Sequence, residues 1–236
     1  MKTLIIIPAF NEAENIEEVA DNLRDNYPEY DFIIINDGSS DNTEEICQKR
    51  GYPCISLPIN LGIGGAVQTG YKYALENGYD IAVQMDGDGQ HDPAYLDEMK
   101  KIIESGESDI VIGSRFVEKE GFQSSATRRV GIGFLSFFGL ILTGVRLRDI
   151  TSGYRMVNRR LIGLYADDYP SDYPEPEAMV IAAIHGFKIK EYPVIMKERI
   201  GGTSSINLKR SVYYMIKVSI AMFIRRISLG FRRDKG

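Results

Sequence analysis

The first half of the chain alternates short apolar runs with segments of helical character. Five runs of mainly apolar residues are typical of buried strands, and they are Thr3–Ile7, Phe32–Ile35, Cys54–Leu57, Ile81–Met85 and Asp109–Gly113. Between these runs, helices are predicted over Ala13–Asn26, Gly65–Glu76 and Pro93–Glu104. Strands that are apolar throughout and separated by helices indicate a mostly parallel sheet with helices on both faces.

The second half of the chain has a different pattern. Val130–Thr143 is apolar with interspersed Gly and Ser, a region of short helices and strands follows over 159–193, and Leu208–Leu229 predicts a basic helix. No stretch resembles a linker, so a separate second domain is not expected. We predict one α/β domain over residues 1–204. Residues 205–236 are predicted to form a basic amphipathic helix that contacts a membrane surface or a partner.

Polar and glycine-rich segments follow several of the predicted strands. They are Pro8–Glu12, Asn36–Ser40, Asp86–Gln90 and Ser114–Arg115. In open parallel sheets, ligands bind in the crevice at the carboxyl ends of the strands. The sequence therefore predicts a binding crevice at one edge of the sheet.

Asp86-Gly87-Asp88 is the most informative of these segments. Two carboxylates two residues apart, directly after an apolar strand, favour Mg²⁺ or Mn²⁺ binding beside phosphate oxygens. A calcium loop of the EF-hand type is excluded because His91 and Asp97 occupy the positions that need Gly and Glu. A polar turn with solvated aspartates is the alternative interpretation.

The glycines between Asn60 and Gly70 allow two interpretations. A dinucleotide-binding turn is weakly supported, because these glycines do not follow the first strand and lack the G-x-G-x-x-G spacing. Close packing of a helix against the sheet beside a nucleotide accounts for them better. Gly62 is a candidate for a direct ligand contact.

Composition and charge narrow the functional class. The chain has 236 residues, of which 44% are hydrophobic, and this excludes a disordered chain. Two cysteines are too few for a disulfide framework or a zinc site of their own. The net charge of −5 argues against a general nucleic-acid binder, but residues 205–236 carry eight Lys and Arg against one Asp. This segment is therefore +7 and the rest of the chain −12, which suggests an acidic body with a basic surface for an anionic partner.

Two apolar segments edged with arginines fit helices that lie in a bilayer interface. No signal peptide is recognised, and no window reaches the roughly 18–20 apolar residues that span a bilayer. The candidates for contact with the membrane or acceptor are Arg128, Arg129, Arg225 and Arg226. Core helices with a solvated basic rim are the alternative. The chain is expected to be cytoplasmic, on the inner face of the plasma membrane.

Five motifs occur in a family-specific order. They are Pro8-Ala9-Phe10-Asn11-Glu12, Asn36-Asp37-Gly38-Ser39-Ser40-Asp41, Asn60-Leu61-Gly62 through Gly70, Asp86-Gly87-Asp88-Gly89-Gln90 and Gly113-Ser114-Arg115. Together they resemble the GT-A glycosyltransferases of family 2, and most closely the dolichyl-phosphate-mannose-synthase-like branch. The resemblance covers about residues 1–200. It implies a GT-A fold and an enzyme that uses a nucleotide-diphosphate sugar.

The resemblance also implies roles for residues of the crevice. Pro8, Phe10 and Glu12 match the loop that contacts the nucleotide base, and Asp37 matches a carboxylate that binds base or ribose. Asn36 departs from the Asp of many members. Nucleotide-sugar contacts are also implied for Asp86, Gly87 and Asp88, and the matched metal-binding run assigns the metal to Asp86, Asp88 and Gln90.

Three segments outside the metal-binding run match catalytic positions of the family. Arg115 is expected to add positive charge near the phosphates, or to form a surface salt bridge. Asp149 is the candidate general base for a hydroxyl acceptor, whereas with a phosphate acceptor it would hold Arg155 or the acceptor site in place. Arg199 and Ser204 are implied to close over the diphosphate, although Ser205 replaces the Lys of many lipid-phosphate members.

Glu175 and Glu177 come at the start of a predicted apolar helix. Two acids in this place suit the helix dipole, so helix capping and an acceptor-site role are both open interpretations. Glu177 is the acceptor-site candidate.

These observations predict an inverting, metal-dependent glycosyltransferase that moves a sugar to a polyprenyl phosphate at the cytoplasmic membrane face. A sugar hydroxyl of a lipid-linked or surface polysaccharide is the alternative acceptor. A nucleotidyltransferase and a non-catalytic nucleotide-sugar-binding module are remoter alternatives. The expected partner is an anionic membrane surface, a small membrane protein is a further candidate partner, and no nucleic acid is expected.

Overall fold

The computed structural model describes residues 1–118, 126–197 and 208–233. Seven strands form one sheet in the order β3-β2-β1-β4-β6-β5-β7. Their bounds are β1 Thr3–Ala9, β2 Asp31–Asn36, β3 Cys54–Ser56, β4 Ile81–Gln84, β5 Ile110–Ser114, β6 Arg155–Asn158 and β7 Ile189–Pro193. Only β6, which pairs with β4 and β5, runs antiparallel to its neighbours in this described sheet. The predicted mostly parallel sheet is confirmed.

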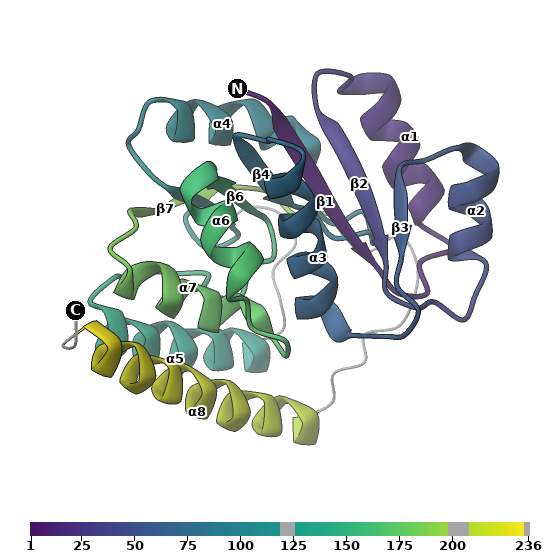
Figure 1. The fold of residues 1–236 in the computed structure, drawn as a ribbon. Helices are drawn as coiled ribbons and strands as arrows, with labels where there is room; N and C mark the ends of the chain where they lie inside the picture. Colours follow the sequence, from purple (N-terminus) through teal and green to yellow (C-terminus); the bar gives the residue numbers. More distant parts are fainter. Residues whose placement is uncertain (119–125, 198–207, 234–236) are drawn as a thin grey trace.

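Helices cover both faces of the sheet (Figure 1). On one face lie α1 Ile16–Asn26, α2 Thr43–Arg50 and α4 Leu96–Glu104, and on the other lie α3 Gly62–Glu76, α6 Arg159–Asp167 and α7 Pro174–Ile184. Because successive side chains of a strand point to opposite faces, β1 contributes to both cores. Leu4 and Ile6 pack toward α3, while Ile5 and Ile7 pack toward α1.

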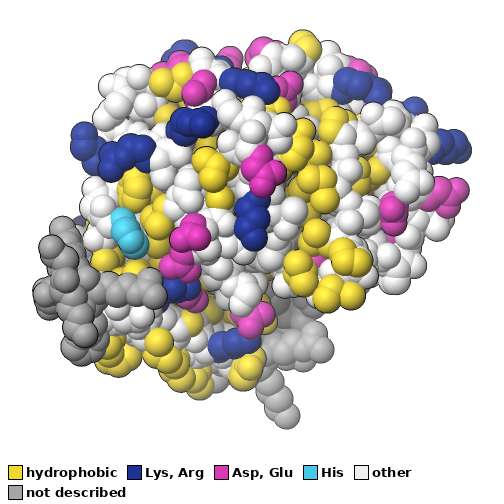
Figure 2. Space-filling model, in the orientation of Figure 1, with side chains coloured by type: hydrophobic (Ala, Val, Ile, Leu, Met, Phe, Trp, Pro, Cys, Tyr) yellow, Lys and Arg dark blue, Asp and Glu magenta, His cyan; other side chains and the backbone are white. Residues whose placement is uncertain are grey.

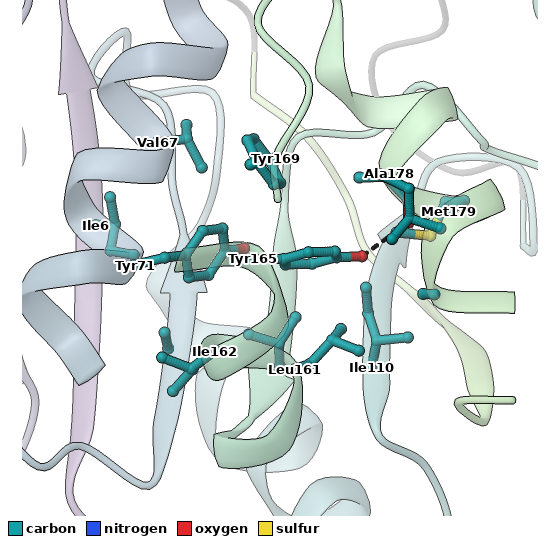
Figure 3. Close-up of a cluster of buried hydrophobic side chains, with 14 of the residues drawn as sticks. Ile6, Val67, Tyr71, Ile110, Leu161, Ile162, Tyr165, Tyr169, Ala178 and Met179 are labelled. Carbon is teal, nitrogen blue, oxygen red and sulfur yellow. Dashed lines mark hydrogen bonds between the residues drawn. The ribbon is translucent and has the colours of Figure 1, made fainter. Parts of the chain in front are cut away.

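Tyrosines join α3 and α6 on the second face (Figure 3). Tyr71 of α3 lies 5.3 Å from Tyr165 and 5.4 Å from Tyr169, measured between ring centroids. The Tyr165 hydroxyl donates a hydrogen bond of 2.9 Å to the carbonyl of Ala178 in α7. Aromatic rings therefore fill the space between three helices, and the polar end of one ring has a partner in this apolar core.

Two further helices form a layer outside α7. These are α5 Ala126–Thr143 and α8 Leu208–Arg233, which lie beside each other at the lower edge of Figure 1. Val218, Met222 and Leu229 of α8 are buried in the same hydrophobic cluster as the strands β1 and β5. The described part of α8 is thus packed onto the α/β body, and the predicted boundary at residue 204 lies outside the described residues.

One strand was not expected from the sequence. The apolar runs predicted β1 to β5 at nearly their observed positions, whereas β6 is a short strand that begins at a charged residue, Arg155. Arg155 of β6 is paired with Gln84 of β4 on one side and with Ile112 of β5 on the other. Its insertion between β4 and β5 brings the segment 149–154 to the edge of the sheet where Asp86 lies.

Candidate active site

The first two loops of the crevice are tied to each other by side-chain hydrogen bonds. Asn11 adopts a positive φ of 56°, its N–H donates to Ser39 Oγ at 3.0 Å, and its Oδ1 accepts from the N–H of Ser40 at 2.8 Å. Pro8 is buried at the end of β1, and Phe10 beyond it is 48% exposed. An exposed ring on a fixed loop is suited to stacking on a flat base. Glu12 accepts a hydrogen bond from Asn15 Nδ2 at 2.7 Å.

Asp37 fixes the second loop to the glycine-rich turn. The side chain is buried, and its Oδ1 accepts a hydrogen bond of 2.7 Å from the N–H of Leu61. Burial raises the pKa of this carboxyl above its ordinary value, and hydrogen bonds from the backbone of Leu61 and Gly62 oppose that rise. A Cβ on Gly38 would lie 2.8 Å from the backbone nitrogen of Asn60, so only glycine permits this close approach. Asp37 and Gly62 are therefore brought together as the sequence predicts.

His91 holds the loop that carries Asp86 and Asp88. The N–H of Asp86 donates to His91 Nδ1 at 3.0 Å, and the imidazole stacks on the ring of Tyr154 with centroids 4.9 Å apart. The Asp86 side chain is 37% exposed and lies 3.8 Å from His91 Nε2. Asp88 is buried, and its Oδ1 accepts from the N–H of Gln90 at 3.1 Å. His91 thus has a structural role in this loop.

The donor set of this loop fits a hard divalent cation. Carboxylate oxygens are the ligands that Mg²⁺ and Mn²⁺ prefer, and Asp86 and Asp88 supply them. Gln90 Nε2 donates to the carbonyl of Lys197 at 3.3 Å, which leaves Oε1 as the ligating atom of that side chain. Within the described residues no group of three or more His, Cys, Asp or Glu is assembled around one point. A cation here would need further oxygens from a bound diphosphate.

Arg115 and Asp149 form a buried, two-pronged ion pair. Arg115 Nε donates to Asp149 Oδ2 and Nη2 donates to Oδ1, both at 2.7 Å. The N–H of Arg115 also donates to Oδ2 at 3.1 Å, and Asp149 is 0% exposed. Burial works to lower the pKa of Arg115, but the hydrogen bond and charge of Asp149 raise it overall. Both oxygens of Asp149 are therefore engaged, an arrangement unsuited to a general base.

Arg155 has a different partner from the one the sequence suggested. Asp149 does not hold it. Its guanidinium donates to the carbonyls of Ser152 at 2.6 Å, Glu175 at 2.6 Å and Ile150 at 2.9 Å. This fully buried cation joins the segment 149–154 to the first turn of α7, and so places Glu175 at the crevice.

Glu175 rather than Glu177 faces the crevice. Burial raises the pKa of the Glu175 carboxyl above its ordinary value, Arg155 opposes the rise, and the charge of Asp86 adds to it. Glu177 binds Arg225 Nε at 2.9 Å, and Arg225 also binds Asp168 at 3.0 Å. In the sequence, both acids stand out only by their position at the start of an apolar helix. That position does not show which of the two turns toward Asp86.

The remaining predicted site residues are those expected to contact the membrane or to close over the diphosphate. Arg129 and Arg226 are exposed, whereas Arg225 is turned toward the body by its two ion pairs. The side chain of Arg128 and the whole of Arg199 and Ser204 lie outside the described residues.

An apolar face covers the outside of α5 and α8. Ten large apolar side chains on these helices are exposed, and we call them the outer apolar face: Val130, Phe134, Phe137, Ile141, Tyr213, Ile216, Ile220, Phe223, Ile224 and Ile227. Figure 2 shows hydrophobic side chains gathered along the lower edge of the molecule, over α8. Among the described helices, none is long and apolar enough to cross a bilayer. Exposed apolar patches of this kind mark interaction surfaces.

Comparisons with known proteins agree on one family. The model of "Glycosyl transferase family 2" matches residues 4–163. An undecaprenyl-phosphate mannosyltransferase of Micrococcus luteus is 33% identical over 88% of this chain and 88% of its own length. A UDP-N-acetylglucosamine–dolichyl-phosphate N-acetylglucosaminyltransferase of Methanococcus voltae is 33% identical over 80% of this chain and 83% of its own length.

A solved structure has the same fold. Glucosyl-3-phosphoglycerate synthase of Mycobacterium tuberculosis, in complex with Mn²⁺, uridine diphosphate and phosphoglyceric acid, aligns with a TM-score of 0.72 over 95% of this chain and 78% of its own. The two sequences are 19% identical, so this likeness concerns the fold alone.

Proposed function

The chain belongs to glycosyl transferase family 2, and from this premise we propose that it transfers a sugar from a nucleotide-diphosphate sugar to a polyprenyl phosphate. Relatives that match 88% and 80% of the chain are named for undecaprenyl-phosphate and dolichyl-phosphate acceptors, respectively. They differ in the sugar, so the class of acceptor is the part of the reaction that these relatives have in common.

The engagement of Asp149 is the observation that carries the choice of acceptor. A hydroxyl acceptor needs a base that removes its proton, and the base candidate of the sequence motif is buried against Arg115. A phosphate acceptor is already anionic and attacks without such a base. Asp149 then serves as a positioning residue that fixes Arg115 and the segment 149–154.

The donor is proposed to lie along the loops at the carboxyl ends of β1, β2 and β4. Phe10 would contact the base, and Asp37 would contact the base or ribose through the carboxylate oxygen that Leu61 does not use. Asp86, Asp88 and Gln90 would hold Mg²⁺ or Mn²⁺ with the diphosphate. A cation there supplies Lewis-acid stabilisation of the leaving nucleoside diphosphate. Arg199 and Ser204 are proposed to close over the diphosphate.

The reaction is proposed to be a single displacement that inverts the anomeric centre. The acceptor phosphate oxygen forms a bond to the anomeric carbon while the bond to the donor diphosphate breaks. The loops tied together by Asn11 and Asp37 hold the donor in one orientation, which is a major source of rate enhancement when two reactants must meet.

The outer apolar face is proposed to rest on an anionic membrane surface at the cytoplasmic side, where a lipid-borne acceptor is found. Exposed apolar side chains on two neighbouring helices, with Arg129 and Arg226 exposed beside them, support an interfacial position. A small membrane protein is the alternative occupant of this face.

A panel assay tests the reaction. The full chain is incubated with Mg²⁺ or Mn²⁺, with UDP-, GDP- and dTDP-sugars, and with polyprenyl phosphate or the matching polyprenol. We expect release of a nucleoside diphosphate and formation of a lipid-linked sugar with the phosphate acceptor only. Equal use of polyprenol, or release of pyrophosphate, would contradict the proposal.

A further inference from the structure

A buried amide at the end of β4 lacks a hydrogen-bond acceptor. Gln84 is 0% exposed, and within the described structure its Nε2 has no hydrogen-bond partner. Its Oε1 accepts a hydrogen bond of 3.5 Å from the hydroxyl of Tyr169. This bond fixes the orientation of the amide, and the two N–H groups of Nε2 then have no acceptor in the described structure. An unsatisfied buried donor destabilises a fold, and such a group in a folded protein calls for a reason.

A carboxylate on the first turn of α7 can accept further hydrogen bonds. Glu175 is only partly exposed, and its carboxyl accepts a hydrogen bond from its own backbone N–H, while Arg155 and Asp86 act on it through their charges. Its backbone carbonyl, by contrast, is fixed by Arg155 at 2.6 Å. Arg155 therefore fixes the backbone at Glu175, and the carboxylate keeps the capacity to accept further hydrogen bonds.

Both groups border one region beside Asp86. Alternation along β4 points Ala82 and Gln84 toward the face covered by α3, α6 and α7, and Glu175 belongs to α7. A Cβ built on Gly153 would lie 3.2 Å from Gln84 Nε2 and 3.2 Å from Asp86 Oδ1. Tyr169, which binds Gln84, also interacts electrostatically with Glu175. Gly153 thus lies directly against the amide and Asp86, and a side chain at this position would crowd both groups.

From this juxtaposition we propose that Gln84 and Glu175 form a subsite for one hydroxyl group of the donor sugar, an inference that rests on the proposed function. A hydroxyl is both a donor and an acceptor. Its O–H would donate to the Glu175 carboxylate while its oxygen accepts from Gln84 Nε2. A phosphate group would suit this region poorly, because the carboxylates of Glu175 and Asp86 both repel it.

The subsite makes the enzyme selective for donors that carry this hydroxyl. A pocket built to hydrogen-bond a hydroxyl rejects an analogue that lacks it, because the buried polar groups are then left without partners. The effect falls on the nucleotide sugar and not on the nucleoside diphosphate, which has no sugar hydroxyl in this position.

The test compares Glu175→Gln and Gln84→Leu with a matched control, Glu76→Gln at the exposed end of α3. Each variant is assayed with the best donor of the panel and with its monodeoxy analogues, and folding is checked by circular dichroism. We expect both crevice variants to raise the KM of the full donor by about tenfold or more. We expect the affinity for the nucleoside diphosphate to stay within about twofold. The native protein should prefer the full donor over one of the deoxy analogues. In both crevice variants this preference should fall toward unity, while Glu76→Gln should keep it.

Two outcomes would overturn the subsite. If the variants lose the same factor with every donor, the residues have a structural role or bind only an ordered water. If Glu175→Gln lowers kcat and shifts the pH profile while the donor KM is unchanged, the carboxyl moves a proton instead.

The subsite is tested separately from the transfer reaction. Binding of the nucleotide sugar and its deoxy analogues is measured by calorimetry without any acceptor. Selectivity for one hydroxyl that disappears in Glu175→Gln supports the subsite even if polyprenyl phosphate proves not to be the acceptor. Equal affinity for all analogues in the native protein contradicts it.

Discussion

The crevice and the outer layer of α5 and α8 use charge and apolar surface in opposite ways. In the crevice, Arg115 and Asp149 are buried and hold each other through two hydrogen bonds. In the outer layer, apolar side chains such as Ile220 and Phe137 are exposed, and Arg225 of α8 is turned inward to Glu177 and Asp168. A fixed polar crevice suits recognition of a soluble donor, whereas an apolar face suits contact with a large apolar surface.

This contrast changes how the basic C-terminal segment is understood. The sequence presents eight Lys and Arg over 205–236 as a surface for an anionic partner. In the structure, Lys217 pairs with Asp172 at 2.7 Å and Arg225 pairs with two acids. Part of the positive charge is therefore neutralised by the body, and apolar contact should supply more of the attachment than the charge count suggests.

The largest expected effect concerns the crevice. Asp88→Asn keeps the size of the side chain but removes a charge from the proposed cation site. We expect sugar transfer to fall by about a hundredfold or more, since metal ions contribute several kcal/mol to such reactions. Initial rates at several Mg²⁺ concentrations measure the loss. Asp167→Asn, at an exposed position, is the control, and near-native rates for Asp88→Asn would argue against metal-assisted transfer.

The second prediction concerns the buried ion pair. Asp149→Ala leaves the Arg115 guanidinium buried without its partner, and the free energy of unfolding should fall by about 3–5 kcal/mol. Urea unfolding measures it. Glu98→Ala removes one partner of the exposed pair with Lys101, and because solvent screens this pair the free energy of unfolding should stay nearly unchanged. Similar losses in the two variants would show that the crevice charges are no more tightly held than surface charges.

The third prediction concerns the outer apolar face. Replacing both Ile216 and Ile220 with Ser should weaken binding to vesicles by about tenfold, because less apolar surface leaves water. Arg226→Gln should weaken binding by about fivefold on anionic vesicles only, as expected for about 1 kcal/mol per exposed basic residue. Sedimentation with vesicles measures both, and Lys49→Gln on α2 is the control. A change in oligomeric state without a change in vesicle binding would instead identify a second copy as the occupant.

The smallest expected effect is that of vesicles on Cys54, which lies far from the outer layer. A hydrogen bond from the Cys47 thiol, together with one from Ser56, lowers the pKa of Cys54 to about 7 although burial opposes this. Because the thiolate is the reactive form, iodoacetamide labelling of Cys54 should rise about tenfold from pH 6 to pH 8. Vesicles should leave the rate unchanged, since β3 is distant from α5 and α8 (Figure 1). A labelling midpoint near pH 9, or protection by vesicles, would contradict this assignment.

The apolar runs of the sequence predicted those strands whose burial is visible in the residues of the strand itself. Ile5 and Ile34 lie in strands with both faces buried, so their runs are apolar throughout and are easily recognised. The strand β6 begins at Arg155, whose charge is accommodated by the nearby carbonyls of Ser152 and Ile150 and by the carbonyl of Glu175, 20 residues further along the chain. The four residues of β6 alone do not show that the charge of Arg155 will be buried in this way.

The same distinction applies to the site. Asp86 and Asp88 are two residues apart, so their shared chemistry is visible along the chain. Asp149 and Arg115 are 34 residues apart, and their pairing depends on the position of β6. The sequence does not distinguish Glu175 from Glu177, because a helix start favours both acids equally and the choice between them depends on Arg155.

The antiparallel strand β6 has a consequence for how the chain is assembled. β4 and β5 are consecutive in sequence, yet the sheet places β6 between them. Until Arg155–Asn158 has been synthesised, β4 has one unpaired edge and β5 has no link to the rest of the sheet. Unpaired strand edges favour association with other chains, and such long-range pairing slows folding. A nascent chain that ends before residue 155 would thus be the form of this protein most prone to aggregate.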